Sequence, residues 1–261
     1  KLLGLQFIAV MPENTTSRKV ELLQALGAVC DLVPIDVDAS QHALNRANNE
    51  NACYLNQFGL AERATDWRGN NNIAESILSQ MTKEENPEPS WIVCGAGTGG
   101  TSATIGRYLR YRRLHTQLCV SEPTGGAFAQ AWGSRNLTRT QPCKTIIEGI
   151  GRSQIEPGFM FDVVDKVIEI TDEASCTGVW MLEKDLGRRY GGSSGTNLIA
   201  CLQLAIEMRK QGEKGSIVSL LCDRGERYAS TLFNPEWLAA HNININQSLD
   251  NWYEMFNTKY V

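Results

Sequence analysis

Short hydrophobic runs alternate along the chain with segments in which apolar residues recur at helical spacing. The runs predict strands at residues 5–11, 29–33, 52–54, 91–94, 117–120, 163–170 and 216–222. The helical spacing predicts helices at residues 18–26, 39–49, 69–81, 101–111, 172–187 and 196–210. Strands separated by helices of this length indicate an α/β fold with mainly parallel sheets flanked by helices.

Composition and charge narrow the class of protein. The chain has 25 Lys and Arg against 29 Asp and Glu, which gives a formal net charge of −4. A strongly basic nucleic-acid-binding protein is therefore not expected. The chain contains no run of about 18 apolar residues, so the sequence predicts no transmembrane helix and no membrane partner.

Eight cysteines are present, and none forms a Cys-x-x-Cys pair. This spacing does not suit a zinc site. Several of them, such as Cys94 and Cys222, lie in apolar runs, which favours buried free thiols in a reducing compartment and hence a cytoplasmic location. None of the three histidines lies in a nucleophile motif, so a hydrolase triad has little support.

A glycine-rich loop after the predicted strand at 91–94 is the strongest local signal. It places backbone N–H groups and a helix N-terminus at one point, which suits a phosphate. Gly95, Gly97 and Gly100 match the dinucleotide pattern GxGxxG, and Glu122 lies 22 residues beyond Gly100, where a ribose partner is expected. A monophosphate cofactor such as pyridoxal phosphate would use the same loop. A tight turn that binds no ligand is the remaining interpretation.

Three further segments weigh against a dinucleotide fold. Residues 191–196 form a second glycine-rich turn, residues 148–151 form a third, and residues 223–228 follow the last predicted strand. A Rossmann domain has no use for these three elements together.

Taken in chain order, these segments resemble the cysteine synthase and cystathionine β-synthase family of pyridoxal-phosphate enzymes, known as fold type II. The resemblance covers nearly the whole chain. It rests on the residues at 9–12, 57–58, 97–101, 122–123, 148–151, 192–195 and 225–228. It implies a two-lobed fold, with residues 1–54 in the remainder of a small N-terminal lobe and residues 55–261 in a larger cofactor-binding lobe. It also implies a homodimer.

The same resemblance assigns roles to individual residues. The phosphate of pyridoxal 5'-phosphate would bind to Gly97, Thr98, Gly99, Gly100 and Thr101. Ser193 would contact the pyridine nitrogen of the cofactor, and Gln57 would lie near the substrate. A neutral serine at the ring nitrogen strengthens the electron sink less than an aspartate would, which suits β-elimination and β-replacement.

A first departure from the family concerns its lysine. The family carries its Schiff-base lysine, and a loop that binds the substrate carboxylate, before the stretch that begins here at Lys1. The nine lysines of this chain lie in no comparable setting. The first residues read as a helix end with Gly4 at its C-cap. We therefore expect further sequence upstream of Lys1, with the Schiff-base lysine in it, and no catalytic residue in this chain.

A second departure follows Gln57. Residues 61–72, which include Trp67 and Arg68, replace the run that is usual in synthases and resemble cysteine desulfhydrase-like members. These two side chains would reshape the pocket over the substrate Cβ or would belong to a surface loop. The leading hypothesis is a lyase that releases sulfide, pyruvate and ammonia from cysteine or a related amino acid. The alternatives are β-replacement of the cysteine synthase (O-acetylserine sulfhydrylase) or cystathionine β-synthase type, a non-catalytic paralogue, and a dinucleotide oxidoreductase.

Overall fold

Two compact units make up the chain in the computed structural model, which describes residues 3–63, 65–69, 71–135 and 143–257. The first unit is Lys1–Gln57 and the second is Phe58–Val261. The boundary predicted from the sequence lies after residue 54, and the assignment of the two lobes stays a prediction. The helix end predicted at the start of the chain involves Lys1 and Leu2, which lie outside the described residues.

The N-terminal unit is a small sheet whose two strands are joined by a helix. Its elements are β1 (Ile8–Pro12), α1 (Ser17–Ala25), β2 (Val29–Val33) and α2 (Ala39–Asn49). The strands are parallel, with Ile8 beside Val29. Gly27 has a φ of 89°, a left-handed conformation that closes α1.

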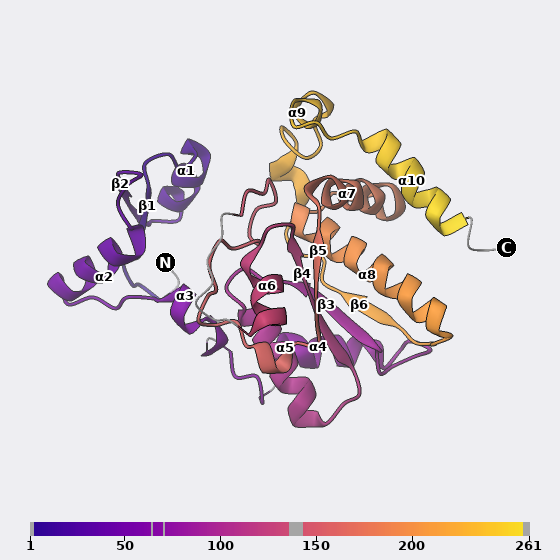
Figure 1. Ribbon diagram of the computed structural model, residues 1–261. Coiled ribbons are helices and arrows are strands. Elements are labelled where there is room, and N and C mark those ends of the chain that lie inside the picture. The colour runs from indigo at the N-terminus through magenta and orange to yellow at the C-terminus, as the bar shows by residue number, and fades with distance from the viewer. Residues whose placement is uncertain (1–2, 64, 70, 136–142, 258–261) are drawn as a thin grey trace. The chain divides into compact units, whose positions relative to one another are not determined.

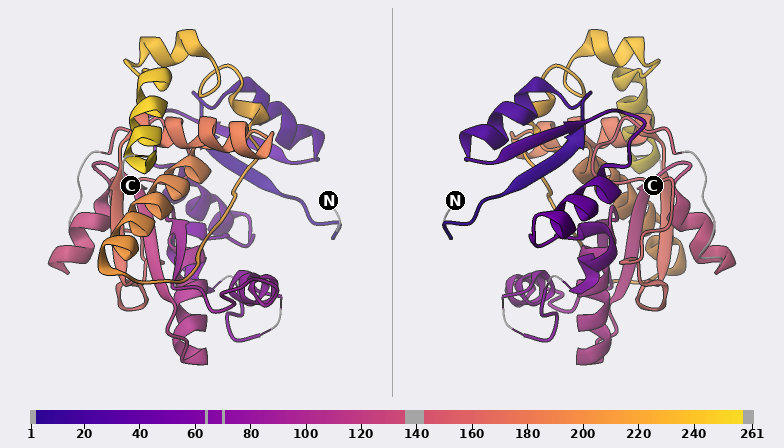
Figure 2. Two further views of the ribbon diagram at one scale, coloured as in Figure 1. Left: turned by 90° about the vertical axis from the view of Figure 1, so that its right-hand side faces the viewer. Right: turned by 90° about the vertical axis from the view of Figure 1, so that its left-hand side faces the viewer.

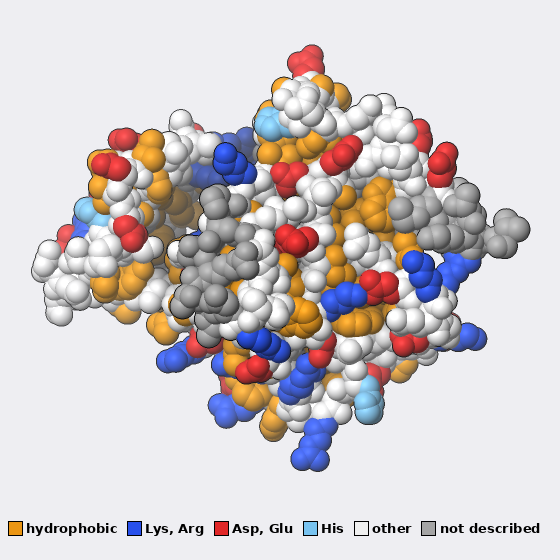
Figure 3. Space-filling view, viewed as in Figure 1, with side chains coloured by type: hydrophobic (Ala, Val, Ile, Leu, Met, Phe, Trp, Pro, Cys, Tyr) orange, Lys and Arg blue, Asp and Glu red, His pale blue; other side chains and the backbone are white. Residues whose placement is uncertain are grey.

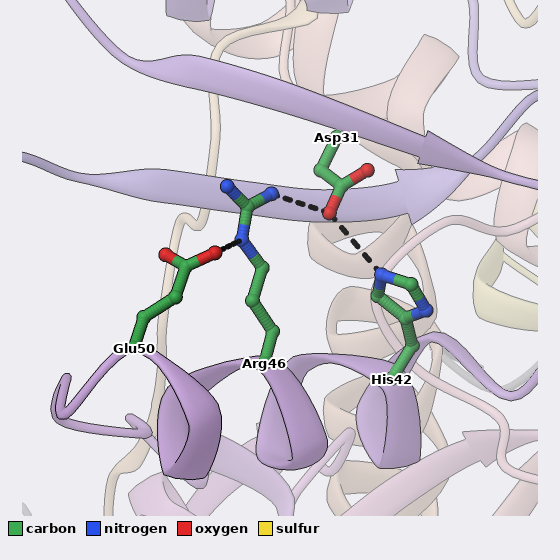
Figure 4. A network of polar contacts seen from close by, with 4 residues as sticks. All are labelled: Asp31, His42, Arg46 and Glu50. Carbon is green, nitrogen blue, oxygen red and sulfur yellow. Dashed lines mark hydrogen bonds and ion pairs between the residues drawn. The ribbon is translucent and has the colours of Figure 1, made fainter.

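A polar network fastens α2 to β2 (Figure 4). Arg46 Nη1 donates a hydrogen bond of 2.6 Å to Asp31 Oδ2, and Arg46 Nε donates one of 2.9 Å to Glu50 Oε1. His42 Nε2 lies 3.2 Å from the same oxygen of Asp31. The Arg46 guanidinium holds the pKa of Asp31 below its ordinary value, against a smaller opposing effect of burial.

The C-terminal unit is a four-stranded sheet covered by helices on both faces (Figure 1). Its elements are α4 (Ile73–Met81), β3 (Trp91–Gly95), α5 (Gly100–Arg112), β4 (Gln117–Pro123), α6 (Ala127–Ser134), β5 (Lys166–Ile170), α7 (Asp172–Leu186), α8 (Gly192–Gln211), β6 (Ile217–Ser219), α9 (Pro235–Ala240) and α10 (Ile245–Asn257), with α3 (Gln57–Leu60) at the boundary between the units. The strands are all parallel and follow the spatial order β5-β4-β3-β6. The predicted parallel α/β architecture is confirmed.

Side chains alternate between the two faces of this sheet, as parallel strands buried on both sides require. Ile92 and Cys94 of β3 pack with side chains of α4, α5 and α6. Val93, between them, packs on the opposite face with α7 and α8. Figure 2 shows the strands between these helical layers. Because every strand has its carboxyl end at the same edge, the loops that follow the strands meet there.

Helices α7 and α8 cross at a pair of glycines. A Cβ added to Gly178 would lie 2.5 Å from the carbonyl oxygen of Gly195, and one added to Gly195 would lie 2.1 Å from that of Ser175. Only glycine allows the two backbones to approach so closely. The crossing fixes the first turn of α8 against the middle of α7.

Several predicted boundaries were wrong. No strand forms at residues 52–54. The strand predicted at 163–170 begins only at Lys166. A short 3-10 helix occupies Phe161–Val163, and the Asp165 carboxylate accepts the Leu118 N–H at 2.8 Å. Residues 125–141, which the sequence left unassigned, include α6, while residues 136–142 lie outside the described part.

No helix in the described part of the chain is both long enough and apolar enough to cross a membrane.

Candidate functional site

The order of the strands creates a topological switch point at the carboxyl edge of the larger sheet, and we call the region outside it the crevice. The chain passes outward from β3 to β4 and β5 and then returns, so that β6 lies on the other side of β3. The connection after β3 runs to α5 on one face, whereas α8, which precedes β6, covers the other face. Ligands of open α/β sheets bind at such a switch point, outside the carboxyl ends of the strands.

The predicted glycine loop lies on one side of this crevice, between β3 and α5. Gly99 has a φ of 82° and is the N-cap of α5, without a side-chain cap. The N–H groups of Gly100, Thr101 and Ser102 find no acceptor in the part of the chain that the structure describes. Three unpaired donors and the positive end of a helix dipole form a site for an anion.

Close packing explains why this loop needs its glycines. A Cβ added to Gly97 would lie 2.3 Å from the carbonyl oxygen of Gly149, which belongs to the third predicted glycine turn. A Cβ added to Gly99 would lie 2.6 Å from the Cα atom of Phe159. The loop is therefore held between other backbone segments, which fixes the direction of its N–H groups.

Two threonines of the loop are available to a ligand. Thr98 is partly buried and Thr101 is exposed. Neither hydroxyl has a hydrogen-bond partner within the described residues. By contrast, the Ser102 hydroxyl donates to the Gly99 carbonyl at 3.0 Å and so serves the loop itself. The two threonines can close a phosphate cup, as the sequence analysis predicts.

Ser193 lies at the start of α8, on the other side of the crevice. The sequence placed this helix start at Thr196, but α8 begins at Gly192, so Ser193 is in its first turn. Ser193 is 8% exposed, and its hydroxyl has no partner among the residues that the structure describes. The neighbouring Ser194 differs, because its Oγ accepts a hydrogen bond of 2.8 Å from the Cys222 N–H.

Contacts between elements bring the glycine loop and the start of α8 together. A Cβ added to Gly95 at the end of β3 would lie 3.6 Å from Asn197 Oδ1, one turn into α8. The Ser194 contact joins the same turn to the loop that follows β6. The phosphate cup, Ser193 and the loop after β6 therefore share the switch point.

Glu122 does not lie where a dinucleotide would need it. Its side chain is fully buried and accepts hydrogen bonds from the N–H groups of Phe128 at 3.2 Å and Ala129 at 2.6 Å. It thus caps α6 from inside the protein. Burial raises the pKa of Glu122 to about 7, while these two bonds act to lower it. The dinucleotide hypothesis loses its ribose partner.

Gln57 and Trp67 are predicted residues outside the glycine loop and α8. Gln57 is exposed, begins α3 and is the last residue of the N-terminal unit, whereas the cup and Ser193 belong to the C-terminal unit. The Trp67 ring packs edge-on against Tyr111, with 5.7 Å between ring centroids, and Arg107 lies 5.9 Å from its centroid. Trp67 therefore packs on the later turns of α5 rather than on its first turn.

Cys222 is a residue of the crevice that the sequence analysis misplaced. Its apolar neighbours predicted a buried thiol, but Cys222 is exposed. The prediction holds for Cys94, which is buried and whose pKa is raised to about 12 by that burial. Cys222 differs because β6 ends at Ser219, so that the chain has left the sheet before it reaches this residue.

Basic side chains gather at the far end of α5, away from the glycine loop at its start. Arg110, Arg112 and Arg113 lie at its C-terminus, and blue side chains are visible at this end in Figure 3. Cations there complement the negative end of the helix dipole. Arg110 also pairs with Asp165 at 2.7 Å, so part of this charge serves the fold.

Comparison with known proteins agrees with this geometry. A family model described as pyridoxal-phosphate dependent enzyme matches residues 1–223. The chain is 50% identical to the L-cysteine desulfhydrase Cds1 of Mycobacterium tuberculosis over 242 residues, which are 93% of this chain and 66% of that protein. It is 29% identical to cysteine synthase 2 of Schizosaccharomyces pombe, over 92% of this chain and 65% of that protein.

A solved structure is similar as well. A hydrogen sulfide-producing enzyme from Fusobacterium nucleatum has a TM-score of 0.75 and 26% sequence identity, covering 90% of this chain and 68% of that one. The chain thus spans about two thirds of the length of the curated relatives it matches.

Proposed function

Because the chain belongs to the family of pyridoxal-phosphate dependent enzymes, we propose that the protein eliminates sulfide from cysteine or a closely related β-substituted amino acid. With cysteine and water the products are sulfide, pyruvate and ammonia. The observation that carries the proposal is the 50% identity to an L-cysteine desulfhydrase over 93% of this chain. The similar fold of a hydrogen sulfide-producing enzyme supports it.

The residues of the crevice fit pyridoxal phosphate. The unpaired N–H groups of Gly100, Thr101 and Ser102, with the Thr98 and Thr101 hydroxyls, would hold its phosphate. The Ser193 hydroxyl, nearly buried and without a protein partner, would accept or donate a hydrogen bond at the ring nitrogen. Because no described residue takes this hydroxyl, it is available to a bound ring.

The chemistry divides between the cofactor and the protein. Pyridoxal phosphate supplies an electron sink for the pair left at Cα when the Cα proton is removed. The cup anchors the phosphate, and the neutral Ser193 leaves the sink moderate, which suits loss of a leaving group from Cβ. Contact of Gln57 with the substrate stays a prediction, as does the Schiff-base lysine expected upstream of Lys1.

The test uses the full-length protein saturated with pyridoxal phosphate. We expect sulfide and pyruvate to appear in equal amounts from cysteine alone, and the visible absorbance of the bound cofactor to change when cysteine is added. If the cofactor binds but neither product forms from cysteine, the proposed elimination is refuted. If no cofactor binds, the assignment of the cup is refuted as well.

β-Replacement is the second candidate, because the chain is also similar to a cysteine synthase. The same protein would be given O-acetylserine and sulfide. Faster consumption of sulfide with O-acetylserine than release of sulfide from cysteine would favour a synthase. Cofactor binding without either reaction would favour the non-catalytic paralogue.

The homodimer and the cytoplasmic location expected from the sequence also stay predictions. All eight cysteines are free thiols, which fits a reducing compartment. Light scattering of the full-length protein would give its oligomeric state, and fractionation of the source cells would give its location.

A further inference from the structure

Asn197 is a buried amide at the crevice to which the sequence analysis gave no role. Its side chain is fully buried in α8. It follows Ser193 by four residues, so the two side chains lie on the same face of the helix. Asn197 therefore lies one turn below the hydroxyl assigned to the pyridine nitrogen.

The side chain of Asn197 connects the ends of three strands. Its Oδ1 accepts a hydrogen bond of 2.7 Å from the Ser121 hydroxyl on β4. Its Nδ2 donates to the Leu220 carbonyl at 3.1 Å and contacts Cys222 Sγ at 3.8 Å, just after β6. A Cβ on Gly95, at the end of β3, would lie 3.6 Å from Oδ1.

Hydrogen bonds from α8 take the place of backbone pairing where β3 and β6 separate. The ladder between β3 and β6 ends with the pair Val93 and Ser219. Beyond it, the Leu220 carbonyl is held by Asn197, and the Cys222 N–H is held by Ser194. Two side chains of α8 thus take over the hydrogen bonds of the segment that forms one wall of the crevice.

We propose that Asn197 is a positioning residue, which fixes the loop after β6 relative to the glycine loop and so sets the width of the crevice for the cofactor ring. This inference rests on the proposed function, since it takes a pyridoxal ring as the occupant. Asn197 acts through Leu220 and Cys222 and touches no reacting atom. The phosphate cup, formed by α5, does not depend on it.

The exposed Cys222 thiol reports on this loop without any catalysis. In cofactor-free full-length protein, the rate at which iodoacetamide alkylates Cys222 is followed by mass spectrometry of its peptide, with the exposed Cys53 as internal reference. The variants are Asn197→Ala and Asn197→Asp. The second keeps the volume and the acceptor for Ser121 but loses the donors to Leu220 and Cys222.

We expect iodoacetamide to alkylate Cys222 at least about fivefold faster in both variants than in the parent, because the loop after β6 is no longer held by Asn197. Binding of pyridoxine phosphate, which has no aldehyde to react with a lysine, should weaken about tenfold. Binding of inorganic phosphate should change by less than about twofold in Asn197→Ala, since the cup is retained.

Ser121→Ala is the matched control, because it removes the bond to β4 and leaves both contacts of Nδ2 with the loop. Its Cys222 reactivity should stay within about twofold of the parent. If both Asn197 variants lower the melting temperature yet keep the parent's Cys222 reactivity and pyridoxine phosphate affinity, the role is merely structural and the proposal is wrong. If the parent itself does not bind pyridoxine phosphate, the proposed function fails, while the thiol rates still decide whether Asn197 holds the loop.

Discussion

The carboxylate of Glu122 accepts a hydrogen bond of 2.6 Å from the N–H of Ala129, so a residue at the end of β4 caps the helix that follows it. The cap requires Gly126, because a Cβ there would lie 2.2 Å from Glu122 Oε2. In the sequence, the same glutamate satisfied the spacing of a ribose-binding acid. Burial behind α6 gives it a structural role instead.

Glu122 should make stability fall as the pH rises toward neutrality. Its pKa is about 7 in the folded protein, against an ordinary value of 4.5, so the folded state keeps a proton that the unfolded chain has lost between these values. The contribution of Glu122 is therefore full below its ordinary pKa and declines as the pH rises through about 7. Glu122→Gln keeps an oxygen for Ala129 and cannot ionise.

The expected result is that the difference in the free energy of unfolding between the parent and Glu122→Gln changes with pH. From about pH 4.5 to about pH 8, the free energy of unfolding of the parent should fall relative to that of Glu122→Gln, by about 3 kcal/mol at most. Urea unfolding of both proteins at the two pH values measures it, and groups common to both cancel. An equal difference at both pH values would show that Glu122 does not titrate in this range.

Asp31 should behave in the opposite sense within the N-terminal unit. Its hydrogen bond from Arg46 lowers its pKa, so its stabilising contribution is present above its ordinary pKa of 3.8 and is lost as the pH falls through the lowered value. Asp31→Asn should therefore speed amide hydrogen exchange in β2 and α2 at neutral pH, by about twofold to threefold, since the pair is partly exposed. The effect should vanish in acid. Equal exchange in both proteins at neutral pH would contradict it.

Gly97 offers a test of the phosphate cup. Gly97→Ala would place a Cβ 2.3 Å from the Gly149 carbonyl, so the loop must move. We expect a loss of about 1–3 kcal/mol in the free energy of unfolding and at least about tenfold weaker binding of pyridoxine phosphate. Urea unfolding and titration of the cofactor-free protein measure the two effects.

Gly133→Ala is the control for this substitution. Gly133 lies in α6, and an added Cβ would meet nothing within 4 Å. The change should leave binding intact and alter stability by no more than about 1 kcal/mol, in the stabilising direction. Weakened binding in this variant as well would show that the Gly97 result does not report on the cup.

The sequence was sufficient for β3, the glycine loop and α5, because a buried run, a cluster of glycines and a helical period follow one another there. It failed at the start of α8. Glycine and serine are poor helix formers, so the first turn looked like a loop, yet the close crossing at Gly178 and Gly195 holds it helical. Tertiary packing overrides propensity at this point.

The end of β6 could not be predicted from the sequence either. An apolar run continues to Cys222, which predicts a strand to that residue. Side chains of α8 instead form hydrogen bonds with the backbone groups of Leu220 and Cys222, and the strand ends at Ser219. Hydrogen bonds between residues more than twenty positions apart produce no periodic pattern in the sequence. The crevice wall therefore became visible only in the structure.

Ser193 and Ser194 are adjacent, and the structure assigns them opposite behaviour. The Ser193 hydroxyl has no partner within the described residues, whereas Ser194 Oγ accepts the Cys222 N–H at 2.8 Å. Ser193→Ala should leave the free energy of unfolding of the cofactor-free protein within about 0.5 kcal/mol of the parent. Ser194→Ala should lower it by about 1–3 kcal/mol, because the Cys222 N–H loses its acceptor.

Cofactor measurements should separate the two serines as well. Ser193→Ala should shift the absorbance of bound pyridoxal phosphate and weaken pyridoxine phosphate binding about tenfold, since the ring nitrogen loses its only assigned partner. In Ser194→Ala, the ring nitrogen keeps that partner, so the absorbance of the cofactor that does bind should match the parent's. A variant of Ser193 that loses stability but keeps the parent's spectrum would show that its hydroxyl serves the helix rather than the cofactor.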